Sequence, residues 1–471
     1  MNEQFDVLVI GGGPGGYAAA LYASAADLSV ALVERDRVGG TCLHRGCIPA
    51  KELLETASVF RTVAGAGQFG VGVQGGDGSG ATIDLATSMK RKQQVVDGLW
   101  KGLEGLLGRR KVSLYAGTGT LSGPGCVSVL NDAGEAEELR GDAVILASGS
   151  LPRTIPGFEV DGRLVLTSDE VLAMDDLPGS AAVIGGGAIG CEFASMLADL
   201  GVQVTLLESL PKILPGCDEA VAAVVRRSFT KRGIDVRTGV KVTGHAPGGG
   251  GTAIAIEGSE ALEVERVVVS VGRRPLSDNL GLDDTGVEVD ERGFVKIDQS
   301  CRTTLEGVWA VGDLVATPQL AHVGFAEGIT AVRDILGEQP LPVQYDKVPW
   351  CIYCHPEVAF VGHSEESARQ AGYDVVASTH HFRGNGRALI VGEADGLVKV
   401  VAERRPDGTA GTVLGVHMVG PWVTEQLGQG YLAVNWEATV EEVAALIQPH
   451  PTLSETFGEA AMALTGRGLH G

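Results

Sequence analysis

Short apolar runs alternate with longer helical patterns in the first part of the chain, which is typical of a sheet flanked by helices. Val7–Ile10 predicts a buried strand that runs into a glycine-rich turn, and the residues from Tyr17 predict a helix. Val30–Val33 predicts the next strand, which ends at Glu34. The same order returns later in the chain, in Ala182–Ile184, a helix through Leu200, and Val202–Leu207 before Glu208. We therefore expect an α/β fold with two βαβ units.

Other stretches give coarser predictions. A helix is expected over Met89–Gly108 and a strand over Lys111–Tyr115, while Gly65–Gly80 predicts a flexible surface loop that holds at most one short strand. Leu262–Val271 has the pattern of one buried strand, and Val308–Asp313 of a strand that ends in a Gly-Asp turn. From about Lys347 the pattern becomes α+β, with strands at Val358–Val361, Leu397–Val401 and Val413–Val419 and helices from Glu425.

Each βαβ unit carries a Gly-x-Gly-x-x-Gly turn directly after its first strand. The glycines are Gly11, Gly13 and Gly16 in the first unit and Gly185, Gly187 and Gly190 in the second. Glu34 follows Gly11, and Glu208 follows Gly185, by the same 23 residues. The glycines allow a tight turn and the close approach of a pyrophosphate to the helix N-terminus, while the carboxylate binds a ribose. The two units therefore predict two Rossmann-like dinucleotide-binding domains.

Two cysteines, Cys42 and Cys47, follow the first unit five positions apart. In a regular helix this offset separates the Cα atoms by about 8.6 Å, whereas a relaxed disulfide needs roughly 4.4–6.8 Å. A disulfide here requires an irregular turn, which Gly46 permits and Pro49 favours. A strained and accessible disulfide is easily reduced. We therefore predict a redox-active pair rather than two buried structural thiols.

A redox-active thiol pair and two dinucleotides suggest that electrons pass between a thiol, a flavin and a nicotinamide. A flavin must touch the disulfide, so the first unit, beside Cys42 and Cys47, is expected to bind FAD and the second to bind the nicotinamide. Glu208 favours NAD, because the 2′-phosphate of NADP requires arginines and is repelled by a carboxylate.

Composition limits the other classes of function. At 471 residues, about three domains are expected. A net charge of −22 argues against binding to nucleic acids or to anionic membrane surfaces. No apolar run reaches the roughly 18 residues that would span a membrane, and Met1–Asp6 leads straight into the first strand. Eight cysteines in a chain of this size suit a reducing compartment, so we expect a cytoplasmic protein.

Two further motifs need weighing. His450 to Glu455 reads either as a capping box, with Thr452 at the N-cap and Glu455 at N3 of the last helix, or as a histidine held by a carboxylate. The second arrangement suits thiol–disulfide chemistry, because only the thiolate attacks and thiols are mostly protonated at pH 7. Cys351 and Cys354 form a C-x-x-C in a strand pattern with no helix start after it, so we expect structural thiols.

The sequence resembles the class I pyridine nucleotide–disulfide oxidoreductases, and within them the branch that oxidises dihydrolipoamide. The resemblance covers essentially the whole chain and rests on Gly11–Gly16, Gly39 to Lys51, Ile189 to Glu192, Gly312-Asp313, Leu320-Ala321-His322, Tyr353 to Glu357 and His450 to Glu455. It implies an FAD-binding domain with the redox disulfide (1–150), an NAD-binding domain (151–275), a central domain completing the FAD site (276–346) and a dimer-interface domain (347–471).

The resemblance also implies roles for single residues. FAD contacts map to Glu34, Lys51, Gly117, Asp313 and Ala321, and NAD contacts to Gly187, Gly190, Glu208, Val242 and Gly272. Lys51 and Glu192 would form an ion pair beside the flavin ring. His450 of one subunit, held by Glu455, would take a proton from dihydrolipoamide, whose thiolate would attack Cys42 of the other subunit. Cys47 would be the flavin-side thiol. No metal is implied.

The family implies a homodimer that serves the lipoyl domain of an acyltransferase or carrier protein, in a 2-oxo acid dehydrogenase or glycine cleavage system. His44-Arg45 and Trp422 depart from the usual pattern, and the basic His44-Arg45 could lower a thiol pKa. The alternatives are a relative that reduces glutathione with NADPH, a non-catalytic flavoprotein, and a zinc protein using Cys42, Cys47, Cys351 and Cys354.

Overall fold

The computed structural model describes residues 4–72 and 80–470. The chain folds as two compact units. The first comprises Met1–Leu53, Asp84–Arg153 and Gly272–Tyr345, and the second Leu54–Ile83, Thr154–Val271 and Asp346–Gly471. Of the predicted glycine-rich loop, residues 73–79 lie outside the described residues, and its described part contains the 3₁₀ helix η1 (Ala66–Phe69).

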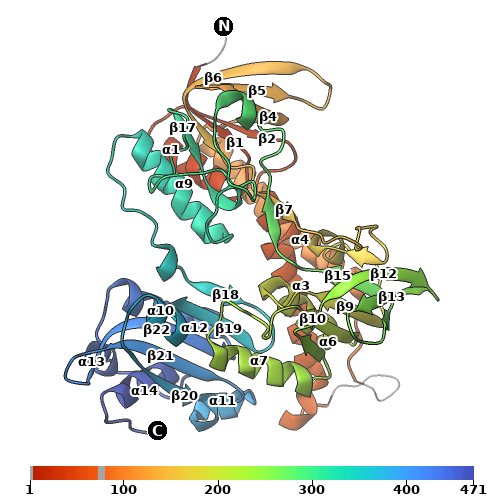
Figure 1. Ribbon diagram of the computed structural model, residues 1–471, viewed down its shortest axis with the longest axis vertical. Helices are drawn as coiled ribbons and strands as arrows, with labels where there is room; N and C mark the ends of the chain where they lie inside the picture. The colour runs from red at the N-terminus through yellow and green to blue at the C-terminus, as the bar shows by residue number, and fades with distance from the viewer. Residues whose placement is uncertain (1–3, 73–79, 471) are drawn as a thin grey trace. The chain divides into compact units, whose positions relative to one another are not determined.

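The first unit is built on a seven-stranded sheet of order β3-β2-β1-β6-β5-β4, with β17 added beside β6 (Figure 1). Strands β1, β2, β3, β6 and β17 pair in parallel, and β4, β5 and β6 form an antiparallel meander. Their bounds are β1 Gln4–Ile10, β2 Val30–Glu34, β3 Ser113–Ala116, β4 Thr118–Gly123, β5 Cys126–Leu130, β6 Ala136–Leu146 and β17 Val308–Ala310.

Strand β1 lies inside the sheet, between β2 and β6, and both of its faces are buried. Val7 and Val9 belong to one hydrophobic cluster and Leu8 and Ile10 to another, as the alternation of side chains along a strand requires. Helix α1 (Pro14–Ala25) and helix α9 (Ala321–Ile335) pack against each other beside this sheet (Figure 1). The other elements of this unit are α2 Gly40–Arg45, the start of α3 Cys47–Ala64, α4 Leu85–Arg109, the antiparallel pair β7 Ser150–Pro152 and β16 Arg273–Pro275, α8 Leu282–Thr285 and η2 Gly312–Leu314. The 3₁₀ helix η3 Tyr345–Lys347 begins at the last residue of this unit.

The second unit contains a parallel sheet of order β11-β10-β9-β15-β8 and a small antiparallel sheet β12-β13-β14. The bounds are β8 Val165–Leu166, β9 Ser180–Ile184, β10 Gln203–Glu208, β11 Asp235–Thr238, β12 Val242–Gly248, β13 Gly251–Ile256, β14 Leu262–Val264 and β15 Arg266–Val269, with helices α5 Ser168–Val171, α6 Ala188–Asp199 and α7 Glu219–Lys231. The predicted single strand Leu262–Val271 is wrong: β14 pairs with β13, whereas β15 enters the parallel sheet beside β9.

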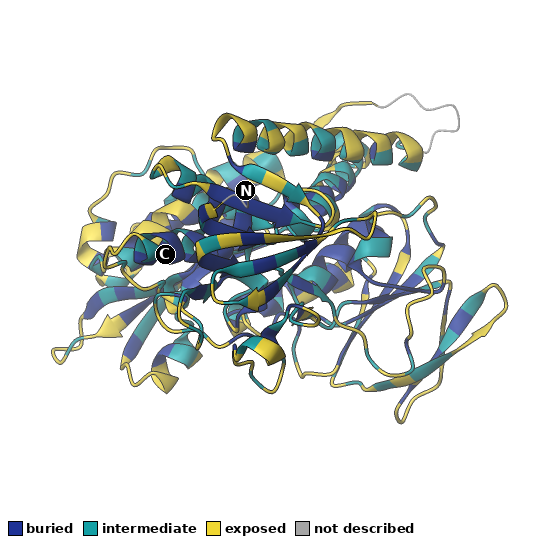
Figure 2. Cartoon of the chain, turned by 90° about the horizontal axis from the view of Figure 1, so that it is seen from above, coloured by how far each residue is buried: buried dark blue, intermediate teal, exposed yellow. Residues whose placement is uncertain are grey.

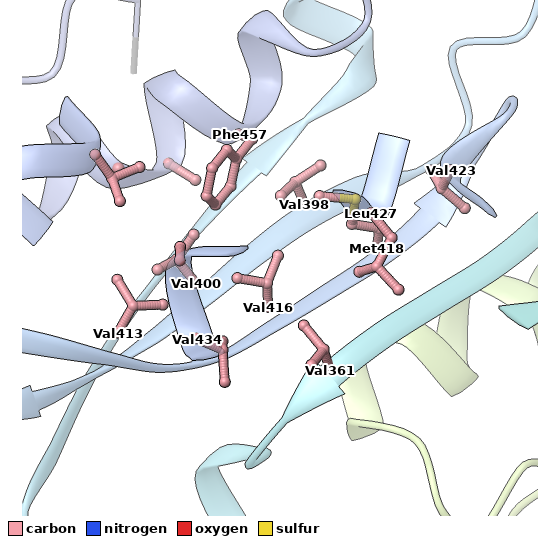
Figure 3. Close-up of a cluster of buried hydrophobic side chains, with 14 of the residues drawn as sticks. Val361, Val398, Val400, Val413, Val416, Met418, Val423, Leu427, Val434 and Phe457 are labelled. Carbon is pink, nitrogen blue, oxygen red and sulfur yellow. The ribbon is translucent and has the colours of Figure 1, made fainter. Parts of the chain in front are cut away.

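The C-terminal part of the second unit is an antiparallel sheet of order β18-β19-β22-β21-β20. Its strands are β18 Trp350–Ile352, β19 Glu357–Gly362, β20 Val375–His381, β21 Leu397–Arg404 and β22 Ala410–Gly420, and its helices are α10 Glu365–Gln370, η4 Phe382–Gly384, α11 Gly386–Val391, α12 Val423–Asn435, α13 Val440–Ala444 and α14 Glu455–Leu464. Figure 3 shows the core, where Val398 and Met418 of the sheet meet Leu427 of α12 and Phe457 of α14.

The expected α/β class with a C-terminal α+β part is confirmed. Buried residues follow the strands, while the outer faces of the helices are exposed (Figure 2). None of the helices within residues 4–72 and 80–470 combines the length and apolar character needed to cross a membrane.

Candidate functional site

The first glycine turn joins β1 to α1 in a conformation that side chains would block. A Cβ on Gly16 would lie 1.8 Å from the carbonyl oxygen of Gly11, and Gly11 itself has φ +102°. Gly13 is the N-cap of α1 and caps it with its backbone alone. The N–H groups of the first turn of α1 therefore face outwards as donors for an anion, and the positive end of the helix dipole favours a phosphate there.

Glu34 lies at the end of β2, beside this turn. Its Oε2 accepts a hydrogen bond from the backbone N–H of Gly12 at 2.7 Å, and its Oε1 accepts one from the N–H of Asp36 at 2.9 Å. The two bonds fix the carboxylate, whose remaining lone pairs suit the hydroxyl groups of a ribose.

The second glycine turn repeats this geometry almost atom for atom. A Cβ on Gly190 would lie 1.9 Å from the carbonyl oxygen of Gly185, and Gly187 is the backbone N-cap of α6. Glu208 Oε2 accepts from the N–H of Gly186 at 2.6 Å, and its Oε1 accepts from the N–H of Leu210 at 2.7 Å. Both turns thus have the shape and donor set that a dinucleotide requires.

The two cysteines of the predicted redox pair are brought together by a break between two helices. Helix α2 ends at Arg45, Gly46 adopts φ −145° and ψ −113°, and α3 begins at Cys47. A Cβ on Gly46 would lie 2.9 Å from the carbonyl oxygen of Thr41, so the turn needs glycine there. The irregular turn expected from the five-residue spacing is present.

The structure shows both cysteines as thiols, hydrogen-bonded to each other. The hydrogen bond with Cys47 and burial raise the pKa of Cys42, and the charge of Lys51 opposes this shift. Lys51 is four residues beyond Cys47 in α3, so both lie on one helix face. Cys42 therefore holds its proton tightly, and ionising this thiol requires a base.

Sequence reasoning missed Tyr17, on α1, which lies near the same thiols. Burial, together with negative charge on Cys42 and Cys47, raises the pKa of Tyr17 to about 12. The expectation that the basic residues His44 and Arg45 lower a thiol pKa finds no support in their contacts. A ring nitrogen of His44 bonds the carbonyl oxygen of Val38, and Arg45 forms an ion pair with Asp36 at 3.2 Å.

Asp313, the predicted polyol ligand, lies in η2 after β17 and is held by residues from distant strands. Ser150 Oγ donates to Asp313 Oδ2 at 2.5 Å, and Arg273 Nε donates to Ser150 Oγ at 2.7 Å. Ser150 and Arg273 were not predicted, although Arg273 follows the expected contact Gly272. Together they fix the Asp313 carboxylate, and the guanidinium Nε of Arg273 lies 3.7 Å from Asp313 Oδ2.

A second unpredicted group supports the same turn from α9. Glu327 is fully buried and accepts hydrogen bonds from the N–H of Gly312 at 2.6 Å and from the hydroxyl of Tyr345 at 2.9 Å. Burial raises the pKa of Glu327 against the effect of these bonds. The motif Gly312-Asp313 is therefore rigid, and Ala321 stands at the first position of α9 in the same unit.

The remaining predicted cofactor residues are placed as follows. Gly117, between β3 and β4, donates its N–H to the carbonyl oxygen of Glu34 at 3.0 Å. Gly272 accepts from the N–H of Arg153 at 2.9 Å, in the first unit. Val242 begins β12 and packs against the hydrophobic cluster around Phe158 in the second unit.

Glu192 and Lys51, the predicted ion pair, belong to different units, so their pairing stays a prediction. Glu192 is buried in α6 and accepts a hydrogen bond from the N–H of Tyr353 at 2.9 Å. Tyr353 is therefore a further residue that sequence reasoning did not assign.

The C-terminal motif forms a histidine–carboxylate pair and not the capping box. Helix α14 begins at Glu455 with Ser454 as its N-cap. Glu455 Oε1 bonds His450 Nδ1 at 2.8 Å, and its Oε2 accepts from the N–H of Thr452 at 2.8 Å. The His450 side chain is 77% exposed, so its other nitrogen is accessible for proton transfer. Partial burial raises the pKa of Glu455, but the bonds from Thr452 and His450 outweigh this and lower it.

Cys351 and Cys354 lie in and just after β18, as the strand pattern predicts. Cys354 is buried, and burial raises its pKa, which suits a structural thiol. Across the described parts of the chain, no three His, Cys, Asp or Glu side chains are grouped as metal ligands.

Two dinucleotide-binding folds, a thiol pair in the unit of the first, and an exposed histidine paired with a carboxylate are the features of a disulfide oxidoreductase that works with a flavin and a nicotinamide. Residues 5–328 match the family model described as pyridine nucleotide-disulphide oxidoreductase, and residues 348–461 match the dimerisation domain of that family. The chain belongs to the pyridine nucleotide-disulphide oxidoreductase family.

Relatives and solved structures agree with this assignment. The chain is 42% identical to dihydrolipoyl dehydrogenase of Bacillus subtilis and 38% identical to that of Cupriavidus necator, each over 100% of both chains. It is similar to the crystal structure of LpdA from Mycobacterium tuberculosis, with a TM-score of 0.90 and 27% identity over 98% of this chain and 99% of that one. The flavoprotein disulfide reductase RclA from Escherichia coli, at 24% identity and a TM-score of 0.84 over 97% and 99%, shares the fold.

The predicted family, enzyme class and cofactors are confirmed: the chain is an oxidoreductase of a flavoprotein family that uses FAD and NAD(H). The C-terminal match to the dimerisation domain supports a homodimer.

Proposed function

We propose that this chain oxidises dihydrolipoamide to lipoamide with NAD⁺ as the acceptor, through Cys42, Cys47 and FAD. The observation that carries the proposal is the thiol pair at Gly46, placed in the same unit as the first dinucleotide turn. The relatives named dihydrolipoyl dehydrogenase, which match over the full length, support the choice of substrate.

The cofactors would be held by the two glycine turns and their partners. FAD would contact Gly11, Gly13, Gly16, Glu34, Lys51, Gly117, Asp313 and Ala321, and NAD would contact Gly185, Gly187, Gly190, Glu208, Val242 and Gly272. Bound FAD supplies two-electron redox chemistry, and NAD⁺ carries the electrons away as a hydride. We retain the division into domains 1–150, 151–275, 276–346 and 347–471 as part of this proposal.

The chain's own residues carry out the thiol chemistry. His450 of one subunit, oriented by Glu455, takes the proton of a substrate thiol. The substrate thiolate attacks the Cys42 sulfur of the other subunit, the disulfide breaks, and Cys47 leaves as a thiolate. The second substrate thiol then displaces lipoamide from Cys42. Lys51, one helical turn beyond Cys47 and paired with Glu192 in this proposal, offsets the negative charge.

We further propose that the active site is shared between the two subunits of a homodimer, and that the reduced lipoyl group arrives on the lipoyl domain of an acyltransferase or carrier protein. The net charge of −22 suits a basic patch on that protein. We place the enzyme in the cytoplasm.

A comparison of two rates tests the proposed function. The purified dimer should reduce NAD⁺ with dihydrolipoamide at least about a hundredfold faster than it oxidises NADPH with glutathione disulfide, because Glu208 opposes the 2′-phosphate of NADPH. Faster turnover of glutathione would support a glutathione reductase-like enzyme instead. A yellow protein inactive with both would be a non-catalytic flavoprotein.

Cofactor choice depends on Glu208. Wild type should strongly favour NAD⁺ over NADP⁺ in kcat/KM, and Glu208→Gln should narrow that ratio by about tenfold, because one charge-assisted hydrogen bond contributes on the order of 1.5 kcal/mol. Glu263→Gln removes an exposed carboxylate on β14 and is the matched control. Equal wild-type rates with NAD⁺ and NADP⁺ would refute the role of Glu208.

A further inference from the structure

The segment after α14 turns back and bonds to that helix. Gly466 has φ +76°, and the chain beyond it brings His470 to Glu459. His470 Nδ1 lies 2.7 Å from Glu459 Oε1, and the N–H of His470 donates to Glu459 Oε2 at 3.2 Å. The Glu459 side chain is only 10% exposed, so this contact is partly shielded from solvent.

Glu459 is one helical turn beyond Glu455, the carboxylate that holds His450. Residues four apart lie on the same face of a helix, and Phe457 fixes the rotation of α14 by inserting into the core (Figure 3). One helix therefore presents two histidine–carboxylate pairs side by side. The charge of His470 also acts on Glu455, where it is among the causes that lower the pKa of that carboxyl.

Other titratable groups border the second pair. Charged and titratable side chains on the elements packed against α14 are His380 and His381 on β20, Lys399, Glu403 and Arg404 on β21, and Glu441 and Glu442 on α13. Lys399, Arg404 and Glu441 form ion pairs with residues outside α14. His380 interacts electrostatically with both Glu459 and His470, and burial lowers its pKa, which favours a neutral ring.

We propose that His470 is a positioning residue for the His450–Glu455 pair: its contact with Glu459 fastens the C-terminal segment to α14 and balances the charge of Glu459 beside the catalytic base. This inference rests on the proposed function of His450. A protonated His470 disfavours a second positive charge on His450, whereas an unbalanced Glu459 favours one. The pair thus leaves little net charge beside the imidazole that takes the substrate proton.

Opposite shifts in two variants test this charge balance. His470→Gln should raise, and Glu459→Gln should lower, the midpoint of the His450 imidazole titration, each by less than the roughly 0.7 pH unit that a unit charge 4 Å away produces in water. The titration is followed by NMR of Cε1-labelled histidine, assigned with His450→Ala. The double variant should return to the wild-type midpoint, and 0.5 M salt should shrink both shifts.

The acid limb of the pH profile of kcat/KM for dihydrolipoamide should shift in the same two directions. Arg467→Gln, which removes an exposed charge of the same sign from the same segment, is the matched control and should shift the midpoint less. Unchanged midpoints, or shifts of the same sign in both single variants, would overturn the proposal. The contact between His470 and Glu459 would then only attach the C-terminal segment to α14. A wild-type enzyme without dihydrolipoamide turnover would overturn the proposed function, while the NMR titration would still decide on His470.

Discussion

Cys42→Ser and Cys47→Ser are expected to fail in different ways. Partial reduction of wild type should give a long-wavelength charge-transfer band from the Cys47 thiolate next to oxidised FAD. Cys42→Ser should keep that band and lose dihydrolipoamide turnover by roughly 10³-fold or more, because the outer nucleophile is gone. Cys47→Ser should lose both. Absorption spectra and steady-state rates on the same samples measure these outcomes.

Cys126→Ser is the matched control for this pair. Cys126 is a partly exposed cysteine on β5 of the same unit, and its replacement should leave band and turnover unchanged. A Cys47→Ser variant that retained the band, beside a Cys42→Ser variant that lost it, would reverse the order of the two thiols in the proposed mechanism.

His450→Ala should lower dihydrolipoamide turnover by about 10²–10⁴-fold, the usual contribution of general acid–base catalysis. The physical reason is that a base must deprotonate the thiols: substrate thiols are mostly protonated near neutrality, and the hydrogen bond with Cys47 and burial raise the pKa of Cys42. Glu455→Gln should cause a smaller loss, because it removes the charge that orients and stabilises the protonated ring but keeps an acceptor for it.

The oxidation of NADH by an artificial acceptor that bypasses the thiols is the internal control for His450→Ala. That rate and the flavin spectrum should stay at wild-type levels. A loss of both activities would indicate a damaged fold. Unchanged dihydrolipoamide turnover would show that His450 takes no part in proton transfer.

Local sequence features predicted the parts of the site that local geometry decides. The glycine turns, the carboxylates that follow them and the break at Gly46 all depend on contacts within one βαβ unit or one turn. The hydrogen bonds that hold Asp313 could not be predicted, because their partners are far apart in the sequence. Ser150 lies 163 residues before Asp313, and Arg273 lies 123 residues after Ser150. Only the fold brings them together.

Two other differences have the same origin. Leu262–Val271 has the pattern of one strand, but its two halves pair with β13 and β9, so the strand divides at Glu265. The spacing of Thr452 and Glu455 suits a capping box as well as a histidine–carboxylate pair between His450 and Glu455. The start of α14 at Glu455 leaves that carboxylate outside the helix interior, where it bonds His450 and the N–H of Thr452.

The shared active site is tested most directly by mixing two inactive homodimers. His450→Ala and Cys42→Ser homodimers should each turn over dihydrolipoamide poorly. After dissociation and mixing, each heterodimer contains one site with both an intact disulfide and an intact histidine, so it should show about half of wild-type activity, since a two-fold dimer has two equivalent sites. If heterodimers are shown to form and no activity returns, His450 acts within its own chain or not at all, and the account of a site built from two subunits is contradicted.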